Sequence, residues 1–260
     1  MPLIGIALSG GGARAAAHIG VLQALNEHGI FPEDVSGSSA GSIIAALYCF
    51  GYTPLEILDL SHEKEFLKIF KLGIFNKGVT ELTFLKRFLE AHIHIPGHEN
   101  PRNRLHVCMS NINSGKFEIA SEGSFIVPLL ASCALPLLFK PIVHNGYTYV
   151  DGGLLNNLPI EPLIGSCDTV IGSSVCPHEE RYDIQGRRNV GSRCFQLAIW
   201  NTVYPRLKEC DLALEIEDSY RFNMFDIKES ERLFEIGYES TLKKIPKLME
   251  ILEEKKQGLL

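Results

Sequence analysis

The chain opens with a short apolar run that leads through consecutive glycines into a helical pattern. Leu3 to Leu8 has the length and composition of a buried strand, and residues 10 to 12 are all glycine. From Ala13 to His28 apolar side chains recur at helical spacing, and Gly29 stands where glycine commonly ends a helix. A strand that passes through a turn into a helix is the repeating unit of α/β folds, and it favours that class here.

Gly10, Gly11 and Gly12 make this turn a candidate anion-binding loop. Glycine lets the backbone approach a ligand closely, and the helix that follows directs its free N–H groups and the positive end of its dipole to the same place. Such N–H groups are the usual donors to the oxyanion of an acyl transfer reaction. Arg14 adds a positive charge, either to position the loop or to favour an anionic head group.

Two nucleotide-binding patterns compete for this loop. A P-loop requires a lysine after its glycines, and none follows them here. A dinucleotide fingerprint is formally matched by Gly10, Gly12 and Ala15, with Glu33 or Asp34 as the acidic residue. No clear second strand ends at that acid, so we expect no dinucleotide. A glycine turn with a purely structural role is the other alternative.

A second motif, Gly37 to Gly41, has the G-x-S-x-G form of a nucleophile elbow. A helical pattern follows it, and its register makes Ser39 the nucleophile rather than Ser38 or Ser42. Residues 34 to 36 are too short and polar a run to predict a strand, so the chain before the motif is expected to be turn-like. The pentapeptide by itself is equally compatible with a serine that caps a helix and has no chemical role.

A nucleophilic serine needs a base, and the sequence offers two candidates. The predicted strand at residues 147 to 150 runs directly into Asp151, Gly152 and Gly153, which fixes a carboxylate at a strand end. An aspartate near its usual pKa of about 3.9 is a poor base, so Asp151 would need burial and direct contact with the serine. His178 follows Asp151 in the chain, as the histidine of an α/β-hydrolase triad would.

Taken together, the three motifs resemble those of the patatin-like phospholipases, which carry G-G-G-x-R/K, G-x-S-x-G and D-G-G/A in this order. The flanking residues 131–136 and 154–159 resemble that family too, and the likeness extends over about residues 4 to 165. One departure is Ala15, because the family often has glycine after the position of Arg14. It bears on the backbone of the loop and not on the catalytic pair.

The resemblance implies a serine acyl hydrolase in which Asp151 activates Ser39 directly, without a histidine. The oxyanion hole would be formed by Gly10, Gly11, Gly12 and Ala40. The glycines that shape the other two motifs would be Gly37, Gly41, Gly152 and Gly153. The implied substrate is a lipid ester, a phospholipid or lysophospholipid, cleaved through an acyl-serine without a metal or organic cofactor. A catalytically silent lipid-binding or regulatory protein is the alternative.

The order of strands and helices along the chain supports a three-layer α/β fold. The resemblance implies the α/β/α patatin-like form of it, with a central, mostly parallel sheet. Strands are expected near residues 105–109, 116–120, 143–150 and 169–172, and helices near residues 41–50, 54–70, 83–91 and 126–134. We expect one domain over residues 1–260, with the catalytic core at 4–165. Its C-terminal part, 166–260, would end in a charged and solvated helical tail from Glu229 to Lys256.

Composition limits the partners. A chain of 260 residues that is 45% hydrophobic can bury a large core, and its net charge of −6 argues against nucleic acid. No apolar stretch approaches 18 residues, and the first residues lack the basic and apolar regions of a signal peptide. Seven cysteines without a C-x-x-C pair fit a reducing compartment, so we expect a cytoplasmic protein.

Three further features have competing interpretations. The segment from Lys64 to Lys77 interleaves lysines with large apolar residues, so it is either an interfacial helix or lid that contacts a membrane, or an amphipathic helix packed on the core. The core position is favoured. His92, His94 and His98 are expected to be loop histidines rather than a metal site, because no ligand partner stands at suitable spacing. Trp200 is either a core residue or part of a pocket wall.

Overall fold

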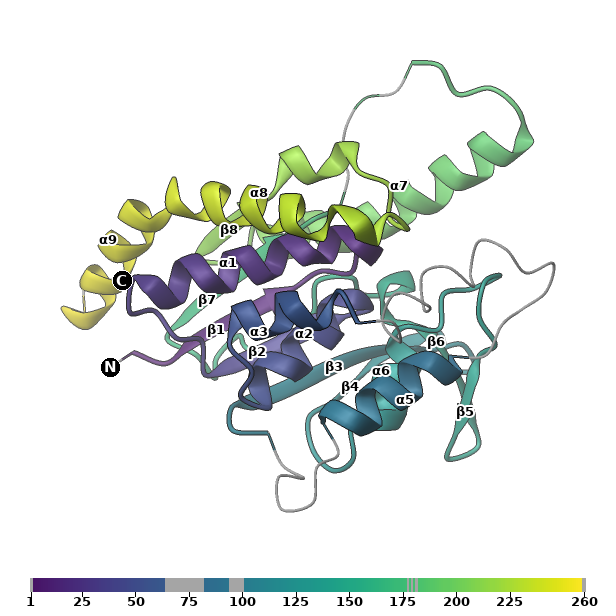
Figure 1. Ribbon diagram of the computed structural model, residues 1–260, viewed down its shortest axis with the longest axis horizontal. Helices are drawn as coiled ribbons and strands as arrows, with labels where there is room; N and C mark the ends of the chain where they lie inside the picture. The colour runs from purple at the N-terminus through teal and green to yellow at the C-terminus, as the bar shows by residue number, and fades with distance from the viewer. Residues whose placement is uncertain are drawn as a thin grey trace.

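In the computed structural model the described residues are 2–63, 82–93, 101–176, 178, 180 and 182–258. The segment at 64–77 lies outside them, as do His94 and His98. Figure 1 shows the described elements as a twisted sheet with helices packed against it.

A mixed sheet of eight strands forms the centre of the molecule, in the order β5-β6-β3-β2-β1-β7-β8, with β4 paired to β3. Its strands are β1 (Ile4–Leu8), β2 (Asp34–Ser38), β3 (Arg104–Asn111), β4 (Lys116–Ala120), β5 (Ile142–His144), β6 (Tyr147–Asp151), β7 (Thr169–Ser174) and β8 (Leu212–Glu215). The neighbours among β3, β2, β1, β7 and β8 are parallel, whereas β4, β5 and β6 join through antiparallel pairings. The expected mostly parallel central sheet is confirmed.

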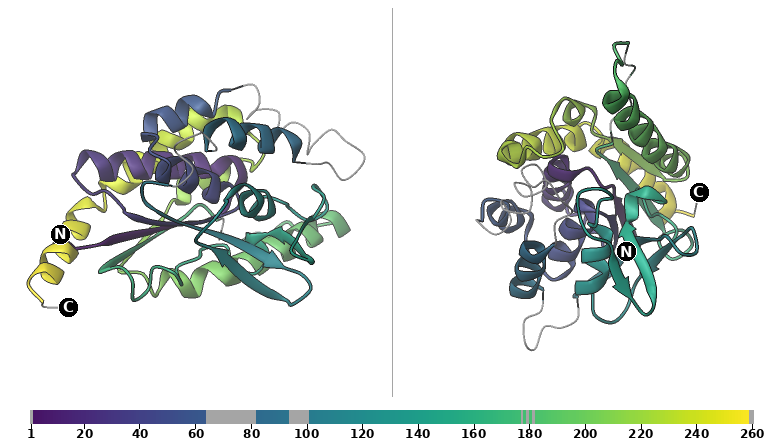
Figure 2. Two further views of the ribbon diagram at one scale, coloured as in Figure 1. Left: turned by 90° about the horizontal axis from the view of Figure 1, so that it is seen from below. Right: turned by 90° about the vertical axis from the view of Figure 1, so that its right-hand side faces the viewer.

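Helices cover both faces of this sheet. They are α1 (Ala16–Glu27), α2 (Ala40–Cys49), α3 (Pro54–Leu60), α5 (Thr83–His92), α6 (Ile126–Ser132), α7 (Arg187–Leu207), α8 (Ser230–Leu242) and α9 (Ile245–Lys256), with short 3-10 turns η1 (Gly12–Ala15), η2 (Gly152–Leu154), η3 (Glu217–Arg221) and η4 (Ile227–Glu229). The left view of Figure 2 shows α7 on one side of the sheet and α1, α3 and α8 on the other. The three-layer α/β/α arrangement is therefore as expected.

The burial pattern of β1 explains why its sequence is a continuous apolar run. Ile6 and Leu8 belong to the larger core cluster under α1 and α2, whereas Ala7 belongs to a second cluster with Trp200 of α7. Because successive side chains of a strand point to opposite faces, a strand covered on both faces must be apolar at every position.

Local signals elsewhere predicted the elements well. The helices expected near 83–91 and 126–134 correspond to α5 and α6, and the predicted strand pair near 105–120 corresponds to β3 and β4. Asn145 and Gly146 join β5 to β6 with φ of 48° and 79°. A two-residue hairpin turn of the primed type needs positive φ at both positions, and these residue types adopt it at little cost.

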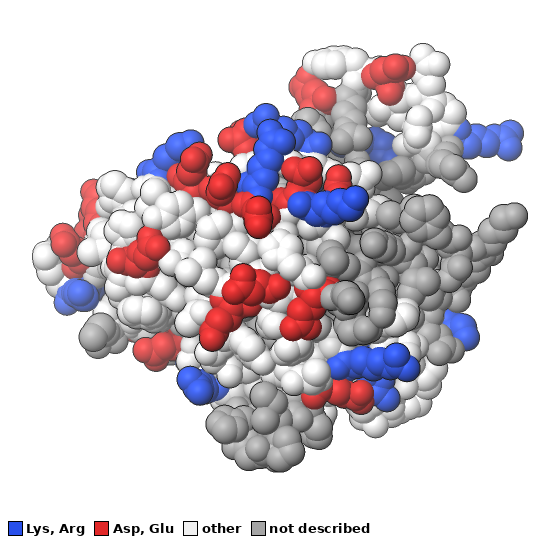
Figure 3. Space-filling view, viewed as in Figure 1, with Lys and Arg blue, Asp and Glu red and all other residues white. Residues whose placement is uncertain are grey.

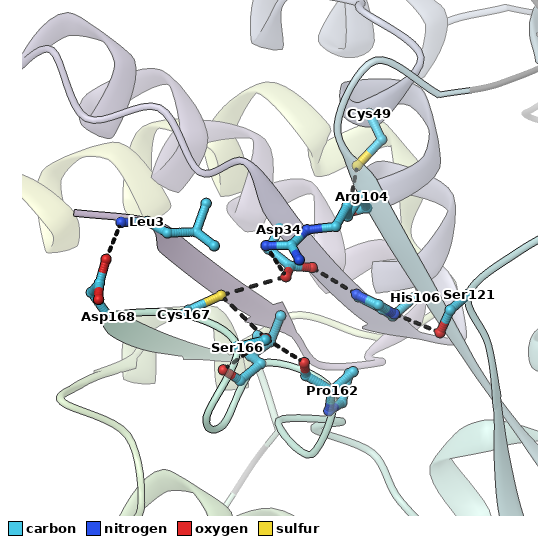
Figure 4. Close-up of polar contacts among 11 residues, drawn as sticks. Leu3, Asp34, Cys49, Arg104, His106, Ser121, Pro162, Ser166, Cys167 and Asp168 are labelled. Carbon is cyan, nitrogen blue, oxygen red and sulfur yellow. Dashed lines mark hydrogen bonds and ion pairs between the residues drawn. The ribbon is translucent and has the colours of Figure 1, made fainter. Parts of the chain in front are cut away.

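The expectation of a turn before Gly37 is wrong, because Asp34 to Ser38 form β2, a central strand. The buried carboxylate of Asp34 lies 2.9 Å from Arg104 Nη2 and 2.6 Å from His106 Nε2, and it accepts a hydrogen bond from Cys167 Sγ at 3.5 Å (Figure 4). These partners come from distant segments and satisfy a polar group that would otherwise oppose strand burial.

The same register removes the dinucleotide alternative. Asp34 pairs with Gly5 of β1, whereas the glycine loop begins only after Leu8. Gly5 and Leu8 are three residues apart in β1, which is about 10 Å along an extended strand. Asp34 therefore lies at the wrong end of β2 to meet a ribose held at the loop. Its carboxylate is also occupied by Arg104 and His106.

The C-terminal tail consists of α8 and α9, and α8 lies along α1 (Figure 1). A Cβ at Gly20 would lie 1.9 Å from the carbonyl oxygen of Phe234, and one at Gly237 would lie 1.9 Å from that of Ala17. The two helices therefore pack backbone to backbone. Acidic and basic side chains are intermixed on the outer surface (Figure 3). The inner face is part of the core, and Leu233 there is fully buried.

Candidate active site

Ser39 occupies a sharp turn between β2 and α2. Its backbone has φ of 51° and ψ of −131°, a conformation that is strained for any residue other than glycine. The turn is held by the Ser39 N–H, which donates to Ser132 Oγ at 2.8 Å, and by the Ser42 hydroxyl, which donates to the Ser39 carbonyl at 2.6 Å. This is the strand, turn and helix geometry of a nucleophile elbow.

The two glycines of this motif are required by close packing. A Cβ at Gly37 would lie 2.6 Å from the Cα of Ser42, and one at Gly41 would lie 2.5 Å from the carbonyl oxygens of Leu8 and Ser9. Side chains at either position would push α2 away from β1 and β2. The glycines thus let the helix start directly against the strand ends, which exposes the serine between them.

β3 brings the serine and the aspartate together. Its residue Cys108 pairs with Ser38 at the end of β2, and the next residue, Met109, pairs with Asp151 at the end of β6. The ends of β2 and β6 therefore lie beside adjacent residues of β3. The Ser39 hydroxyl donates to Asp151 Oδ2 at 2.6 Å.

The environment of Asp151 changes its acidity. The side chain is buried, and its Oδ1 accepts the N–H of Gly153 at 2.8 Å. Burial raises the pKa of Asp151 to about 6, and the hydrogen bonds from Ser39 and Gly153 oppose that rise. A carboxylate with this pKa is a stronger base than a solvated aspartate and is still mostly ionised at neutral pH.

The glycine loop passes beside the serine. Gly10 donates its N–H to Asn157 Oδ1 at 3.1 Å, and Arg14 donates from Nε to the carbonyl of Gly11 at 3.3 Å. Gly12 has φ of 61°, and a Cβ there would lie 2.2 Å from the carbonyl oxygen of Met224. The Arg14 bond joins the side chain to the backbone of the loop itself.

A largely apolar pocket opens over these groups. The glycine loop, Ser39, Ala40 and Asp151 are among the residues that line it. Its apolar walls include Ile43, Leu82, Leu85, Phe139, Ile199 and Phe225. Such a surface favours the hydrocarbon part of a ligand and lowers the local dielectric around the carboxylate.

The histidine candidates take other positions. His178 stacks on Trp200 with a ring separation of 4.2 Å, and the hydrogen bonds to the Asp151 carboxylate within the described residues come from Ser39 and Gly153. Trp200 is a core residue of the α7 cluster. His92 is not in a loop as expected, because it is the last residue of α5, where its ring lies 3.1 Å from the Tyr52 hydroxyl. The described part of the chain contains no group of three or more His, Cys, Asp or Glu residues that could hold a metal ion.

Sequence reasoning missed three residues that support the site. Asn157 contacts the glycine loop, Ser132 holds the backbone of the elbow, and the buried His18 of α1 donates from Nε2 to the carbonyl of Ser9 at 2.9 Å. Asn157 and Ser132 lie in the segments that resemble the family, so their position beside the motifs was the available signal. His18 stood within a helical apolar pattern, which gave no sign of a buried polar contact.

Comparison with solved structures supports the architecture. VipD from Legionella pneumophila superimposes with a TM-score of 0.52 at 18% sequence identity, over 98% of this chain and 67% of that one. Identity this low establishes a shared fold and nothing further. None of the helices in the described part of the chain combines the length and the apolar character that a membrane span requires.

Comparison with known sequences identifies the family. The patatin-like phospholipase family matches residues 6–164, which is more than half of the chain. The lysophospholipase NTE1 of Meyerozyma guilliermondii is 30% identical over 175 residues, 62% of this chain and 12% of that protein. The NTE1 of Eremothecium gossypii is 28% identical over 216 residues, 76% of this chain and 14% of that protein, so the chain spans about an eighth of the length of these relatives. On this match, and with the three motifs in one site, the chain belongs to the patatin-like phospholipase family.

Proposed function

We propose that this protein is a serine acyl hydrolase that cleaves carboxylic ester bonds of lipids through Ser39 and Asp151. The observation that carries the proposal is the 2.6 Å hydrogen bond from the Ser39 hydroxyl to a buried carboxylate whose pKa is raised to about 6. Family membership supports the same class of enzyme. The chain's relatives named lysophospholipase favour a phospholipid or lysophospholipid as substrate.

In the reaction, Asp151 takes the proton of Ser39 as its oxygen attacks the ester carbonyl. The tetrahedral intermediate collapses to an acyl-serine, and the alcohol leaves with the proton that Asp151 returns. The same carboxylate then removes a proton from water, and the water oxygen attacks the acyl-serine. The bond between the carbonyl carbon and Ser39 Oγ breaks, the fatty acid leaves, and Asp151 returns the proton to Ser39. Every proton moves through one carboxylate, so the proposal needs no histidine.

The developing oxyanion would be stabilised by backbone N–H groups of the glycine loop and of Ala40. Gly12 begins η1 and Ala40 begins α2, and the first N–H groups of a helix have no acceptor within it. Gly11 and Gly12 line the pocket next to Ser39. The N–H of Gly10 is occupied by Asn157, so we assign Gly10 a role in shaping the loop and leave donation to Gly11, Gly12 and Ala40.

The pocket supports a substrate with a hydrocarbon chain. Its volume is about 140 Å³. Since a protein cavity of about 150 Å³ accommodates benzene, this volume holds a short length of acyl chain next to the serine. The largely apolar lining fits a lipid that enters from a membrane or micelle, which is why we propose peripheral contact with a lipid surface. All seven cysteines are unpaired, which supports a reducing, cytoplasmic location.

The C-terminal part is proposed to belong to the same domain as the catalytic core. Its helix α8 packs on α1, and Met224 closes against Gly12 of the catalytic loop. Segments that share a core and a pocket wall are expected to unfold together. A single cooperative unfolding transition, followed by both circular dichroism and Trp200 fluorescence, is the result that this proposal requires.

The experiment that tests the function combines labelling and turnover. Wild type, Ser39→Ala and Asp151→Asn are treated with a fluorophosphonate probe and assayed on a lysophospholipid, with folding checked by circular dichroism. We expect wild type to be labelled at Ser39 and to release fatty acid, and both variants to lose turnover by more than about 10³-fold. A folded wild type that is neither labelled nor active would instead favour a lipid-binding protein without catalysis.

A further inference from the structure

Asn157 connects two of the three motifs. It lies six residues after Asp151, and only 3% of its surface is exposed. Its Oδ1 accepts the N–H of Gly10 at 3.1 Å, and its Nδ2 donates to the carbonyl of Gly10 at 3.3 Å. One side-chain amide thus holds both polar groups of a single glycine in the loop.

The second N–H of the Asn157 side-chain amide is also hydrogen-bonded. Nδ2 donates its second hydrogen towards Cys176 Sγ at 2.7 Å. A primary amide has two donor hydrogens, and both are directed to protein atoms here. Asn157 is therefore not free to donate to a substrate oxyanion, although it lines the pocket. Any effect on the reaction must pass through the backbone of the loop.

The position of Asn157 Oδ1 also explains two glycines of different motifs. A Cβ at Gly10 would lie 2.5 Å from this oxygen, and so would a Cβ at Gly153. Both glycines leave room for the same atom, one from the first motif and one from the third. The main chain of Asn157 is in turn fixed from α7, because its N–H donates to Thr202 Oγ1 at 3.0 Å.

We propose that Asn157 is a positioning residue that sets the glycine loop in register with Ser39 and Asp151, so that the N–H groups of Gly11 and Gly12 point at the oxyanion. The inference rests on the proposed function. Three consecutive glycines have unusually wide backbone freedom, so the loop needs an external clamp to hold its donors in one orientation. Donors that are held in place before the reaction stabilise the transition state more than donors that must be ordered during it.

The test compares Asn157→Ala with Asn156→Ala. The neighbouring Asn156 is equally buried in the same turn, but its amide bonds Glu161 and the N–H of Leu158, not the loop. On a short-chain soluble ester we expect Asn157→Ala to lower kcat by about 10²-fold with little change in KM, since a displacement of about 1 Å in a catalytic group costs that much. Asn156→Ala should keep the wild-type kcat.

A second readout separates positioning from a general loss of structure. Trifluoromethyl ketones with an acyl chain add to an active serine and form a tetrahedral adduct that carries an oxyanion. Their inhibition constant should rise in Asn157→Ala by about the factor by which kcat falls, whereas inhibition by the corresponding fatty alcohol should stay the same. If Asn157→Ala does not fold, Asn157→Asp, which keeps the volume but cannot donate to the Gly10 carbonyl, should show the same pattern.

The outcomes distinguish this inference from the proposed function. If wild type and Asn157 variants all turn over substrate with equal kcat, the enzyme is a hydrolase and the positioning role is wrong. If Asn157→Ala weakens inhibition by the trifluoromethyl ketone and by the fatty alcohol equally, the positioning role is also wrong, because that result means a damaged pocket. If wild type has no turnover, the proposed function itself fails.

Discussion

The hydroxyl of Ser39 meets the carboxylate of Asp151 at 2.6 Å although 112 positions of sequence separate them. The contact depends on β3, whose adjacent residues Cys108 and Met109 pair with the ends of β2 and β6. Since the carboxylate is buried at this meeting point, its ionisation controls both the proposed reaction and the stability of the fold.

The rate should follow the ionisation of Asp151. The base must be deprotonated, so kcat/KM for a soluble ester is expected to rise with pH, with a midpoint near the pKa of about 6, and then to level off. A profile from pH 4.5 to 8.5 measures this midpoint. His178→Ala should leave it unchanged, because His178 stacks on Trp200. A midpoint that disappears in His178→Ala would instead indicate a histidine base.

Asp151→Asn should make the protein more stable at neutral pH. The folded pKa of about 6 lies above the usual value of 3.8, so the carboxyl favours the folded state below pH 3.8 and loses that contribution as pH rises through 6. Removing the charge should raise the free energy of unfolding by on the order of 2 to 3 kcal/mol at pH 7.5.

Urea unfolding of wild type and Asp151→Asn at pH 7.5 and at pH 4 measures this difference. The gain should be large at pH 7.5 and small at pH 4, where Asp151 is protonated in the folded protein. If Asp151→Asn is less stable than wild type at pH 7.5, burial of the Asp151 carboxylate does not destabilise the folded protein, and the prediction is wrong.

His18 should make the folded protein less stable as pH falls, which is the opposite of the effect of Asp151. Burial lowers its pKa from 6.5 to about 4, and the hydrogen bond to the carbonyl of Ser9 only partly opposes this. Between pH 6.5 and 4 the unfolded chain binds a proton that the folded protein excludes, so stability falls as pH falls through this range. The effect partly cancels that of Asp151 in wild type.

The contribution of His18 is therefore best measured in the Asp151→Asn background. Unfolding free energies between pH 7 and 4 should fall steeply in Asp151→Asn and less steeply when His18→Asn is added. Equal slopes in the two proteins would mean that His18 titrates normally.

The contact between α1 and α8 should not tolerate a methyl group. In Gly237→Ala the new Cβ would meet the carbonyl oxygen of Ala17 at 1.9 Å, so the helices must separate, and we expect a loss of about 1 to 3 kcal/mol or more. Gly191 of α7 is the matched control, because a Cβ there meets nothing within 4 Å. Gly191→Ala should stabilise the helix by about 0.5 to 1 kcal/mol. Thermal unfolding of both variants tests the contrast.

Sequence alone was sufficient where a structure depends on neighbouring residues. The buried strand β1, the Asn145-Gly146 hairpin and the register that singles out Ser39 all follow from local periodicity and backbone preference. The fold class followed as well, because strands and helices alternate along the first half of the chain. The resemblance to a family then favoured Asp151 as the base that we propose, whereas spacing alone left it in competition with His178.

Only the tertiary structure decided the features that depend on distant segments. Residues 34 to 38 form a central strand because Arg104, His106 and Cys167 satisfy a buried aspartate from elsewhere in the chain. The raised pKa of Asp151 comes from its burial in the folded protein, and the side chain of Asn157 contacts Gly10, which lies 147 positions away in the sequence. Local patterns record which conformations a segment can adopt, whereas burial and long-range hydrogen bonds determine which polar residues become reactive or structural.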